Sequence, residues 1–253
     1  MTGLLEGKVI LVTGAGGGIG KTAAQHFARE GASVVATGRS LASVEAVASA
    51  IEAVGGACFP MAVDVASGAD CAKMVAAAVG EFGRLDGAFN NAGVDGPLVP
   101  AADYPEEAFD QLIAINLKGV WNCMRHEIPA MLAGGGGSIV NNASALSEVG
   151  QFNMIAYCAA KAGVLGLTRA AALDYGARGI RVNTLSPGVI ETPMMTSQME
   201  TYPELRAALL ARHPLGRLGE PREIAEAAAW MLSDRSSFML GANLAVDGGY
   251  LAM

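Results

Sequence analysis

Short apolar segments alternate with longer alanine-rich segments along nearly the whole chain. The apolar segments are KVILVTG (8–14), SVVATG (33–38), ACFPMAVD (57–64), LDGAFNNAG (85–93), GSIVNNAS (137–144), IRVNTLSPG (180–188) and a short last one near ANLAVDGG (242–249). Strands that are apolar throughout are buried on both faces, and strands that alternate with helices are parallel. Because crossovers are right-handed, the sequence predicts an α/β fold: a doubly wound parallel sheet with helices on both faces.

The alanine-rich segments between these strands have helical patterns. They cover 19–31, 41–56, 69–82, 106–132, a segment around Tyr157, and 222–233. Gly31 stops the first helix, and Pro60 weakens the third strand because proline cannot donate a ladder hydrogen bond. No linker or repeat interrupts the series, so we expect one domain.

The composition fits one large core: of 253 residues, 52% are apolar and 16% charged. No apolar run reaches the roughly 18 to 20 residues that span a bilayer, and the N-terminus enters a strand pattern without a charged leader. We therefore expect a cytoplasmic protein. The net charge of −7 argues against nucleic acid or an anionic membrane as a partner. The cysteines and histidines lack metal-ligand spacing, so no metal site is expected.

The loop TGAGGGIG (13–20) lies directly between the first strand and the first helix. Ligands of a doubly wound sheet bind beyond the carboxyl ends of its strands. Gly14, Gly18 and Gly20 would let the backbone turn sharply and approach a pyrophosphate, whose charge suits a helix N-terminus. Their G-x-x-x-G-x-G spacing departs from the usual G-x-G-x-x-G, and a glycine loop alone is weak evidence, but its place directly after the first strand favours a dinucleotide site.

The segment IAYCAAKAGVLG (155–166) puts a phenol and an ammonium group four residues apart. On a helix, Tyr157 and Lys161 would share one face. Taken alone, such a pair is more often a satisfied structural contact than a proton donor beside the charge that tunes it.

Six motifs occur in one order: TGAGGGIG (13–20), NNAG (90–93), Asn116 in INLKG, Ser144 in NNASA, YCAAK (157–161) and SPGVIETPM (186–194). Together they resemble the short-chain dehydrogenase/reductase family in its compact form of about 250 residues, and the resemblance extends through VDGG (246–249). It implies one Rossmann-like domain over 1–253, a nicotinamide cofactor, and hydride transfer between that cofactor and a ketone or secondary alcohol.

Carried over position by position, the resemblance implies four catalytic residues. Tyr157 would be the acid/base, Ser144 would hold the substrate oxygen, Lys161 would bind the nicotinamide ribose and tune Tyr157, and Asn116 would hold the water that links Lys161 to solvent. A lysine charge about 4 Å from a phenol contributes roughly 4 kcal/mol at an effective dielectric of about 20. We therefore expect Lys161 to bring the pKa of Tyr157 from about 10 to near neutrality.

The second strand ends in ATGRS, with Gly38 where an NAD site usually has a carboxylate. Arg39 beside it could pair with a 2′-phosphate through its planar fork, which favours NADP(H). Arg39 could instead stack on the adenine, which leaves NAD(H) possible, and Gly17 stands where many NADP-using relatives have a second basic residue. Further cofactor contacts that the resemblance implies are Ile19, Asp64, Val65, Asn91, Pro187, Gly188, Ile190 and Thr192.

The segment 193–219 stands where the family has its mobile substrate lid. Met194, Met195 and Met199 would give the lid an apolar inner surface, although packing of a helix on the core explains them equally well. By position alone, six residues could line the substrate pocket: Val94, Asp95, Leu146, Glu148, Gln151 and Met154. A moderately apolar ketone or secondary alcohol is the substrate class that follows.

Two other functions fit the same pattern. A 3-ketoacyl carrier-protein reductase would usually have basic residues near the cleft for an acidic carrier protein, and the acidic chain is mild evidence against that. A non-catalytic NADP(H)-binding sensor on the same fold is disfavoured by the complete set of Ser144, Tyr157 and Lys161.

The resemblance also implies a homotetramer. The small residues Ala159, Gly163 and Gly166 would allow close contacts between helices of two subunits, and the C-terminal GGYLAM could lie in a second interface. Internal packing explains both features equally well.

Overall fold

A parallel sheet organises the protein, and the computed structural model describes residues 3–192, 195–196, 199–200 and 203–253. Seven strands of the described residues form this sheet in the order β3-β2-β1-β4-β5-β6-β7, and every neighbouring pair is parallel. The strands are β1 (Val9–Thr13), β2 (Ser33–Gly38), β3 (Cys58–Ala62), β4 (Gly87–Asn90), β5 (Gly137–Asn142), β6 (Ile180–Pro187) and β7 (Asn243–Val246). The predicted doubly wound sheet is confirmed.

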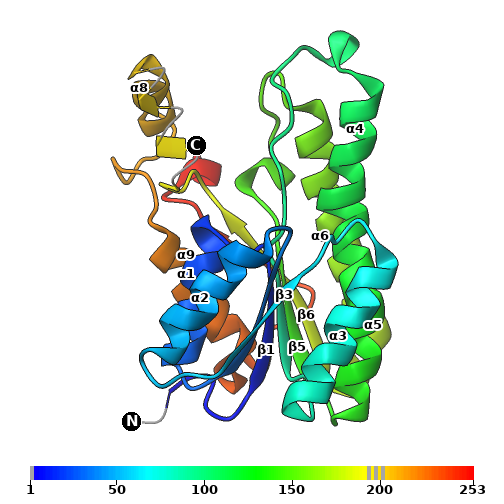
Figure 1. Cartoon of the computed structure of the whole chain (residues 1–253). Helices are drawn as coiled ribbons and strands as arrows, with labels where there is room; N and C mark the ends of the chain where they lie inside the picture. Colours follow the sequence, from blue (N-terminus) through cyan, green and yellow to red (C-terminus); the bar gives the residue numbers. More distant parts are fainter. Residues whose placement is uncertain (1–2, 193–194, 197–198, 201–202) are drawn as a thin grey trace.

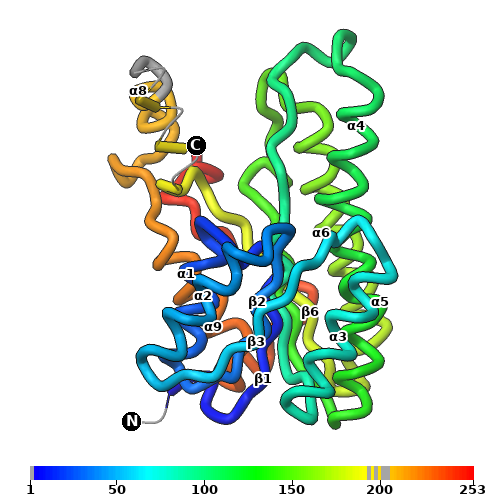
Figure 2. The backbone as a smooth tube through the Cα atoms, in the orientation of Figure 1, coloured from blue at the N-terminus to red at the C-terminus, as the bar shows by residue number. Residues whose placement is uncertain are grey.

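Helices cover both faces of the sheet (Figure 1). On one face lie α1 (Gly18–Arg29), α2 (Leu41–Glu52) and α9 (Pro221–Leu232); on the other lie α3 (Gly68–Phe82), α4 (Glu106–Ile113), α5 (Gly119–Ala133) and α6 (Ile155–Tyr175). A further helix, α8 (Pro203–Leu210), projects beyond the same end of the sheet as α4, on the opposite side (Figure 2).

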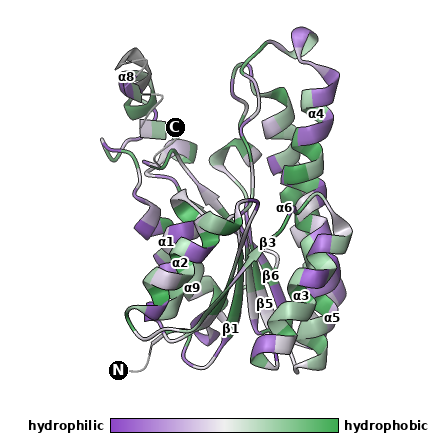
Figure 3. Ribbon diagram, in the orientation of Figure 1, coloured by the Kyte–Doolittle hydropathy of each residue, from purple (hydrophilic) through white to green (hydrophobic). Residues whose placement is uncertain are grey.

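Each layer of helices encloses its own hydrophobic core. Strand β1 contributes to both, because successive side chains of a strand point to opposite faces. Ile10 and Val12 pack with the α1–α2–α9 layer, whereas Val9 and Leu11 pack with the α3–α5–α6 layer. The apolar colouring in Figure 3 accordingly follows the strands and the inner faces of the helices.

The order of the strands reverses between β1 and β4. The first three strands proceed outward from β1 in one direction, and β4 to β7 proceed in the other. A crevice opens at such a switch point beyond the carboxyl ends of the strands, because the crossovers on its two sides leave in opposite directions. The fold therefore brings the residues after β1, β4, β5 and β6 to one place.

Two local features refine the predicted elements. The helix expected over 106–132 consists of α4 and α5 joined by a π-helical turn at Ala114–Lys118, which contains Asn116. Pro60 does lie within β3, where it pairs with Ala36, but β3 is an edge strand and therefore tolerates proline.

Among the helices that the described residues form, none combines the length and apolar character that a membrane crossing requires.

Candidate active site

A cleft of about 970 Å³ lies at the carboxyl ends of β1, β4, β5 and β6. Most of its exposed lining is apolar, with a few polar groups among it. Eleven of the predicted site residues line this cleft: Gly14, Gly18, Ile19, Asn91, Ser144, Tyr157, Lys161, Pro187, Gly188, Ile190 and Thr192. Apolar clefts with a few convergent polar groups are typical of small-molecule sites.

The glycine loop adopts a conformation that side chains would prevent. Gly14 and Gly18 have φ angles of 67° and 50°, in the left-handed region that glycine tolerates. A Cβ on Gly20 would lie 2.2 Å from the Gly14 carbonyl oxygen, so the first turn of α1 can pack against the loop only without a side chain there.

Among the described residues, no side chain caps the N-terminus of α1. Its N-cap residue, Gly17, has no side chain to accept hydrogen bonds from the first N–H groups, and the first turn carries no acidic residue. A Cβ at Gly17 would also meet no atom of the part of the chain that the structure describes within 4 Å. Unpaired N–H groups at the positive end of a helix dipole suit a phosphate group, so the loop fits the pyrophosphate of a dinucleotide.

Ser144 follows the end of β5 and caps a short 3₁₀ turn (Ala145–Ser147). Its Oγ accepts a hydrogen bond from the Leu146 N–H at 3.1 Å, and its own N–H donates to Ser147 Oγ at 3.2 Å. This reciprocal capping fixes Ser144 and leaves its hydroxyl proton free to be donated. The Ser144 hydroxyl also lies close enough to Tyr157 to lower the pKa of the phenol.

Tyr157 and Lys161 lie on α6 and face the cleft together. Lys161 is buried, at 4% exposure, and its Nζ donates to the carbonyl oxygen of Asn142, at the end of β5, over 2.7 Å. The same Nζ lies 5.7 Å from the centre of the Tyr157 ring. The shared helix face expected from the four-residue spacing is thus confirmed.

The pKa values of this pair correct the electrostatic prediction. Burial raises the pKa of Tyr157 above its ordinary value of 10; the charge of Asp95 raises it further, and the nearby Ser144 hydroxyl opposes both. Burial lowers the pKa of Lys161 to about 8, against the charge of Asp95. Because Lys161 loses its proton at a lower pH than Tyr157 does, it does not bring the phenol to neutrality, and our expectation of a near-neutral Tyr157 was wrong.

Asn116 is fully buried in the π-helical turn and contacts the backbone of Val94. Its Oδ1 accepts from the Val94 N–H at 2.9 Å, and its Nδ2 donates to the Val94 carbonyl oxygen at 2.7 Å. A Cβ on Gly93 would lie 3.3 Å from Asn116 Oδ1 and 3.7 Å from Lys161 Nζ. Asn116 therefore positions the loop after β4 beside Lys161. Its role toward a water stays a prediction.

The ends of three strands are joined through Asn91. Its Nδ2 donates to the Thr13 carbonyl oxygen at 3.1 Å, and its Oδ1 accepts from Asn142 Nδ2 at 3.0 Å. The Thr13 hydroxyl oxygen in turn accepts from the N–H groups of Asn91 and Ala92, each at 3.0 Å. The side chain of Asn91 thus holds the floor of the cleft together.

Some predicted residues lie outside the cleft lining: Gly20, Arg39, Asp64, Val65, Asn116 and Glu148. Arg39 is exposed just after β2. Asp64 is exposed and accepts from the Ala66 N–H at 2.9 Å, and Val65 is buried against α5. Glu148 Oε1 accepts a hydrogen bond from Asn243 Nδ2 and does not line the cleft.

Of the expected substrate-pocket residues, Val94, Asp95, Leu146, Gln151 and Met154 line the cleft, as does Met195 of the expected lid. Met199 is buried, and Met194 lies outside the described residues.

The segment after β6 is fixed by His213, which the sequence did not single out. Its Nε2 accepts from the Val189 N–H at 3.1 Å, and its Nδ1 lies 2.8 Å from the Leu209 carbonyl oxygen. The ring thus connects the stretch that contains Pro187, Gly188 and Ile190 to the end of α8. A histidine followed by proline in a segment of uncertain pattern gave no signal of this.

Arg212 and Tyr250 also line the cleft and were not predicted from the sequence. Arg212 Nη1 donates to Gln151 Oε1 and to the Tyr250 hydroxyl. These three residues are far apart in the chain, so neither spacing nor periodicity could have brought them together.

Comparisons with known proteins agree with this geometry. A family model described as enoyl-(acyl carrier protein) reductase matches residues 14–251. A cyclohexanol dehydrogenase from Acinetobacter sp. is 42% identical over 99% of this chain and 97% of its own length. A 2,5-dichloro-2,5-cyclohexadiene-1,4-diol dehydrogenase from Sphingobium indicum is 44% identical over 98% and 99%. A 3-oxoacyl-acyl-carrier-protein reductase from Thermotoga maritima is 40% identical over 97% and 98%.

Two solved structures are also similar to this chain over nearly its whole length. Levodione reductase has a TM-score of 0.92 and 37% identity, covering 98% of this chain and 99% of that one. A structure from Beutenbergia cavernae, named as an NAD(P)-dependent gluconate 5-dehydrogenase with bound NADP, has a TM-score of 0.93 and 38% identity, with 98% of both chains covered.

Proposed function

Since this chain belongs to the short-chain dehydrogenase/reductase family and is an NAD(P)-dependent oxidoreductase of secondary alcohols and ketones, we propose that its substrates are ring alcohols and ring ketones. The observation that carries the proposal is the convergence of Ser144, Tyr157 and Lys161 on one largely apolar cleft. Two relatives are named for alcohols on six-membered carbon rings, and an apolar lining of this kind suits such a ring.

In the proposed reaction, Tyr157 donates its proton to the carbonyl oxygen during reduction and takes it back during oxidation. The Ser144 hydroxyl donates to the same oxygen, which it can do because its Oγ accepts from the Leu146 N–H and is fixed by that bond. Lys161 carries a charge beside the phenol and is oriented by Asn142. Asn116 positions Val94 at the edge of the site. The nicotinamide cofactor supplies the hydride when bound.

The residues present fit such a cofactor. The loop from Gly14 to Gly18 and the uncapped N-terminus of α1 would receive the pyrophosphate. Thr192 lies against this loop, since a Cβ on Gly18 would approach Thr192 Cγ2 to 3.3 Å. We propose, as the family resemblance implies, that Ile190 and Thr192 contact the nicotinamide end of the cofactor; both line the same cleft as Lys161.

We propose that NADP(H) is preferred over NAD(H). Gly38 leaves the end of β2 without a carboxylate, and a Cβ there would lie 3.7 Å from the Gly16 nitrogen, so β2 ends close to the glycine loop. Arg39, exposed at this point, is the nearby cation for a 2′-phosphate. Dissociation constants for NADPH and NADH, measured for the wild type and Arg39→Gln, test this. Equal constants in the wild type would refute the preference, and an unchanged NADPH constant in the variant would refute the role of Arg39.

We also propose that the segment 193–219 acts as a substrate lid. Met195, Ala208 and Leu209 line the cleft, and His213 ties the end of α8 to the stretch after β6. The cytoplasmic location expected from the sequence stays a prediction.

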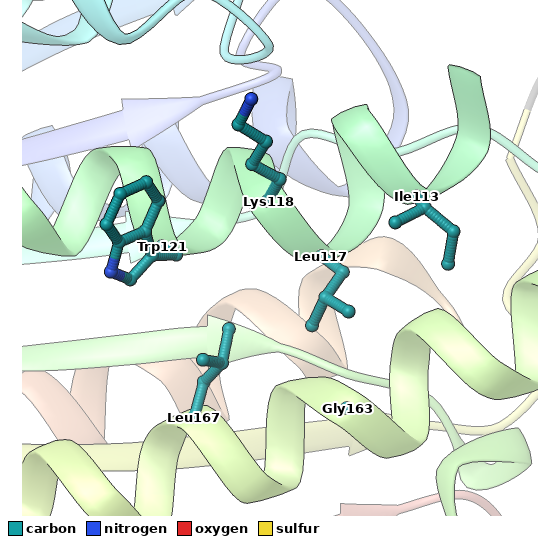
Figure 4. A pocket seen from close by; sticks show the side chains of 6 residues that line it. All are labelled: Ile113, Leu117, Lys118, Trp121, Gly163 and Leu167. Carbon is teal, nitrogen blue, oxygen red and sulfur yellow. The ribbon is translucent and has the colours of Figure 1, made fainter. Parts of the chain in front are cut away.

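We propose a homotetramer that forms through the surface of α4, the π-helical turn, α5 and α6. An apolar hollow lies there, lined by Ile113, Leu117, Lys118, Trp121, Gly163 and Leu167 (Figure 4). Gly163 is explained by internal packing, because a Cβ would approach Leu117 Cδ1 to 2.8 Å. Gly166, in contrast, is exposed, and a Cβ there would meet none of the described residues within 4 Å, as a close contact with a second subunit requires.

Light scattering on Gly166→Arg tests this surface. The variant should form smaller assemblies than the wild type, whereas Gly80→Arg, at an exposed helical glycine on α3 whose Cβ would likewise meet none of the described residues, should not. A monomeric wild type would refute the assembly.

The test of the function is oxidation of NADPH and NADH with a panel of ring ketones, with Tyr157→Phe as the control. Turnover of ring ketones should fall about 10²- to 10⁴-fold in the variant, because general acid catalysis contributes that much. Turnover of ring ketones that is no better than that of open-chain 3-ketoacyl thioesters would favour a carrier-protein reductase, which the Thermotoga relative supports. Tight NADPH binding without any turnover would favour a non-catalytic sensor.

A further inference from the structure

Arg212 lies just after α8 and lines the cleft, yet no step of the proposed reaction uses it. Its Nη1 donates to Gln151 Oε1 and to the Tyr250 hydroxyl, and the guanidinium carbon lies 5.3 Å from the centre of the Tyr250 ring. Gln151 belongs to the loop after β5 and Tyr250 to the C-terminal turn. Contacts from two separate segments therefore fix the position of the guanidinium.

The guanidinium of Arg212 has further N–H groups that can donate hydrogen bonds. It carries five N–H groups, and the two on Nη1 are already used. Among the described residues, Nε and Nη2 have no hydrogen-bond partner, and no ion pair between those residues includes Arg212. The Nε–Nη2 edge presents two parallel N–H groups, which is the arrangement that binds both oxygens of a carboxylate.

The other charged groups of the cleft determine where an anion can bind. Asp95 lies at the reacting end, close enough to Tyr157 and Lys161 to act on both through its charge. A carboxylate on the substrate would be repelled from Asp95 and attracted to Arg212.

We propose that Arg212, held by Gln151 and Tyr250, binds a carboxylate that the substrate carries on the part of its ring remote from the reacting carbon. The preferred substrates are then ring ketones or ring alcohols with an acidic substituent. This inference rests on the proposed function, because it takes the reaction to occur at Tyr157.

The test compares three ketones that share one ring: cyclohexanone, 4-oxocyclohexanecarboxamide and 4-oxocyclohexanecarboxylate. The carboxamide matches the carboxylate in shape but has no charge. In the wild type, the carboxylate should have the lowest KM. In Arg212→Gln, its KM should rise roughly 10- to 100-fold, as expected for lost hydrogen bonds to a charged group. The KM values of the two neutral ketones should change less than about threefold.

Two further variants separate binding from folding. Arg212→Lys keeps the charge but not the fork, so it should weaken binding of the carboxylate less than Arg212→Gln does. Arg222→Gln removes an exposed arginine of α9 that pairs with Glu226, away from the cleft, and it should leave all three KM values unchanged. An equal loss for all three ketones in Arg212→Gln would overturn the proposal, because a structural role predicts that result.

A binding measurement keeps the inference distinct from the proposed function. Cyclohexanecarboxylate, which cannot react, is titrated by calorimetry into the wild type and Arg212→Gln, each saturated with NADP⁺. Weaker binding to the variant supports the anion site even if no ketone is turned over, a result that would refute the proposed function alone. Equal binding, or none to the wild type, overturns the anion site even if cyclohexanone is reduced.

Discussion

Glu127 is a fully buried carboxyl group on α5 with a strongly altered pKa. Its Oε2 accepts a hydrogen bond from Asn90 Nδ2 at 3.0 Å, whereas its Oε1 has no partner among the described residues. Burial raises the pKa of Glu127 from 4.5 to about 8, although the Asn90 bond acts in the opposite direction. The folded protein therefore carries Glu127 in its acid form at neutral pH.

The sign of the effect on stability follows from proton binding. Between pH 4.5 and 8, the unfolded chain has lost this proton and the folded protein has kept it. Because the folded state then binds more protons, its stability decreases as the pH rises through this window, by about 1.4 kcal/mol per pH unit. Across the whole window the free energy of unfolding decreases by a total on the order of 5 kcal/mol. Below pH 4.5 Glu127 causes no such decrease, and above pH 8 the decrease is complete and no longer changes with pH.

Urea unfolding of the wild type and Glu127→Gln at pH 5, 6, 7 and 8 tests this reasoning. The amide cannot ionise, so the variant should gain free energy of unfolding relative to the wild type with each pH unit. Both proteins are measured at one concentration because an oligomer's stability depends on it. Glu81→Gln, at an exposed position on α3, serves as the control and should show no such gain. Parallel curves for wild type and Glu127→Gln would refute an acid form of Glu127 in the folded protein.

Two predictions concern the active site. Gly20→Ala should weaken NADPH binding more than about tenfold, because its Cβ would lie 2.2 Å from the Gly14 carbonyl oxygen of the glycine loop. Gly80→Ala, whose Cβ would meet none of the described residues, is the control in the same titration. Equal affinities of wild type and Gly20→Ala for NADPH would contradict the cofactor role of the loop. Asp95→Asn should move the kcat/KM profile of alcohol oxidation to lower pH, because the Asp95 charge raises the pKa of Tyr157, the proton acceptor in that direction. A profile that stays in place or moves to higher pH would contradict that assignment.

The sheet could be predicted from the sequence because its evidence is local. Each strand is a short apolar run, and the crossover rules then leave few topologies. The position of the cleft could also be predicted, because the carboxyl ends of parallel strands meet at one edge of the sheet. A helix pattern, however, does not distinguish α from π turns over five residues, so the π-helical turn at Ala114–Lys118 was not predicted.

Contacts between segments that are distant in the chain could not be predicted from the sequence. Arg212, Gln151 and Tyr250 lie in segments without regular periodicity, and only the folded chain brings them together. The same holds for Glu127, whose position in the middle of a helix gives no indication that Asn90 is its partner and that its Oε1 has none among the described residues.

The prediction of a near-neutral pKa for Tyr157 was wrong for a different reason. A Coulomb estimate that uses spacing alone contains the attraction between Lys161 and a phenolate but not the cost of removing both groups from water. In the structure that cost dominates: the pKa of Lys161 falls to about 8 and that of Tyr157 rises.

The order in which the pair titrates determines what it can do at neutral pH. Lys161 and Tyr157 both carry their protons there, so the phenol is ready to donate one, as reduction of a ketone requires. Oxidation of an alcohol needs the phenolate, and the chain's own negative charge at Asp95 opposes its formation. Asp95→Asn is therefore a sharper test of the pair than Tyr157→Phe, because it changes the readiness of Tyr157 to accept a proton while the donor remains in place.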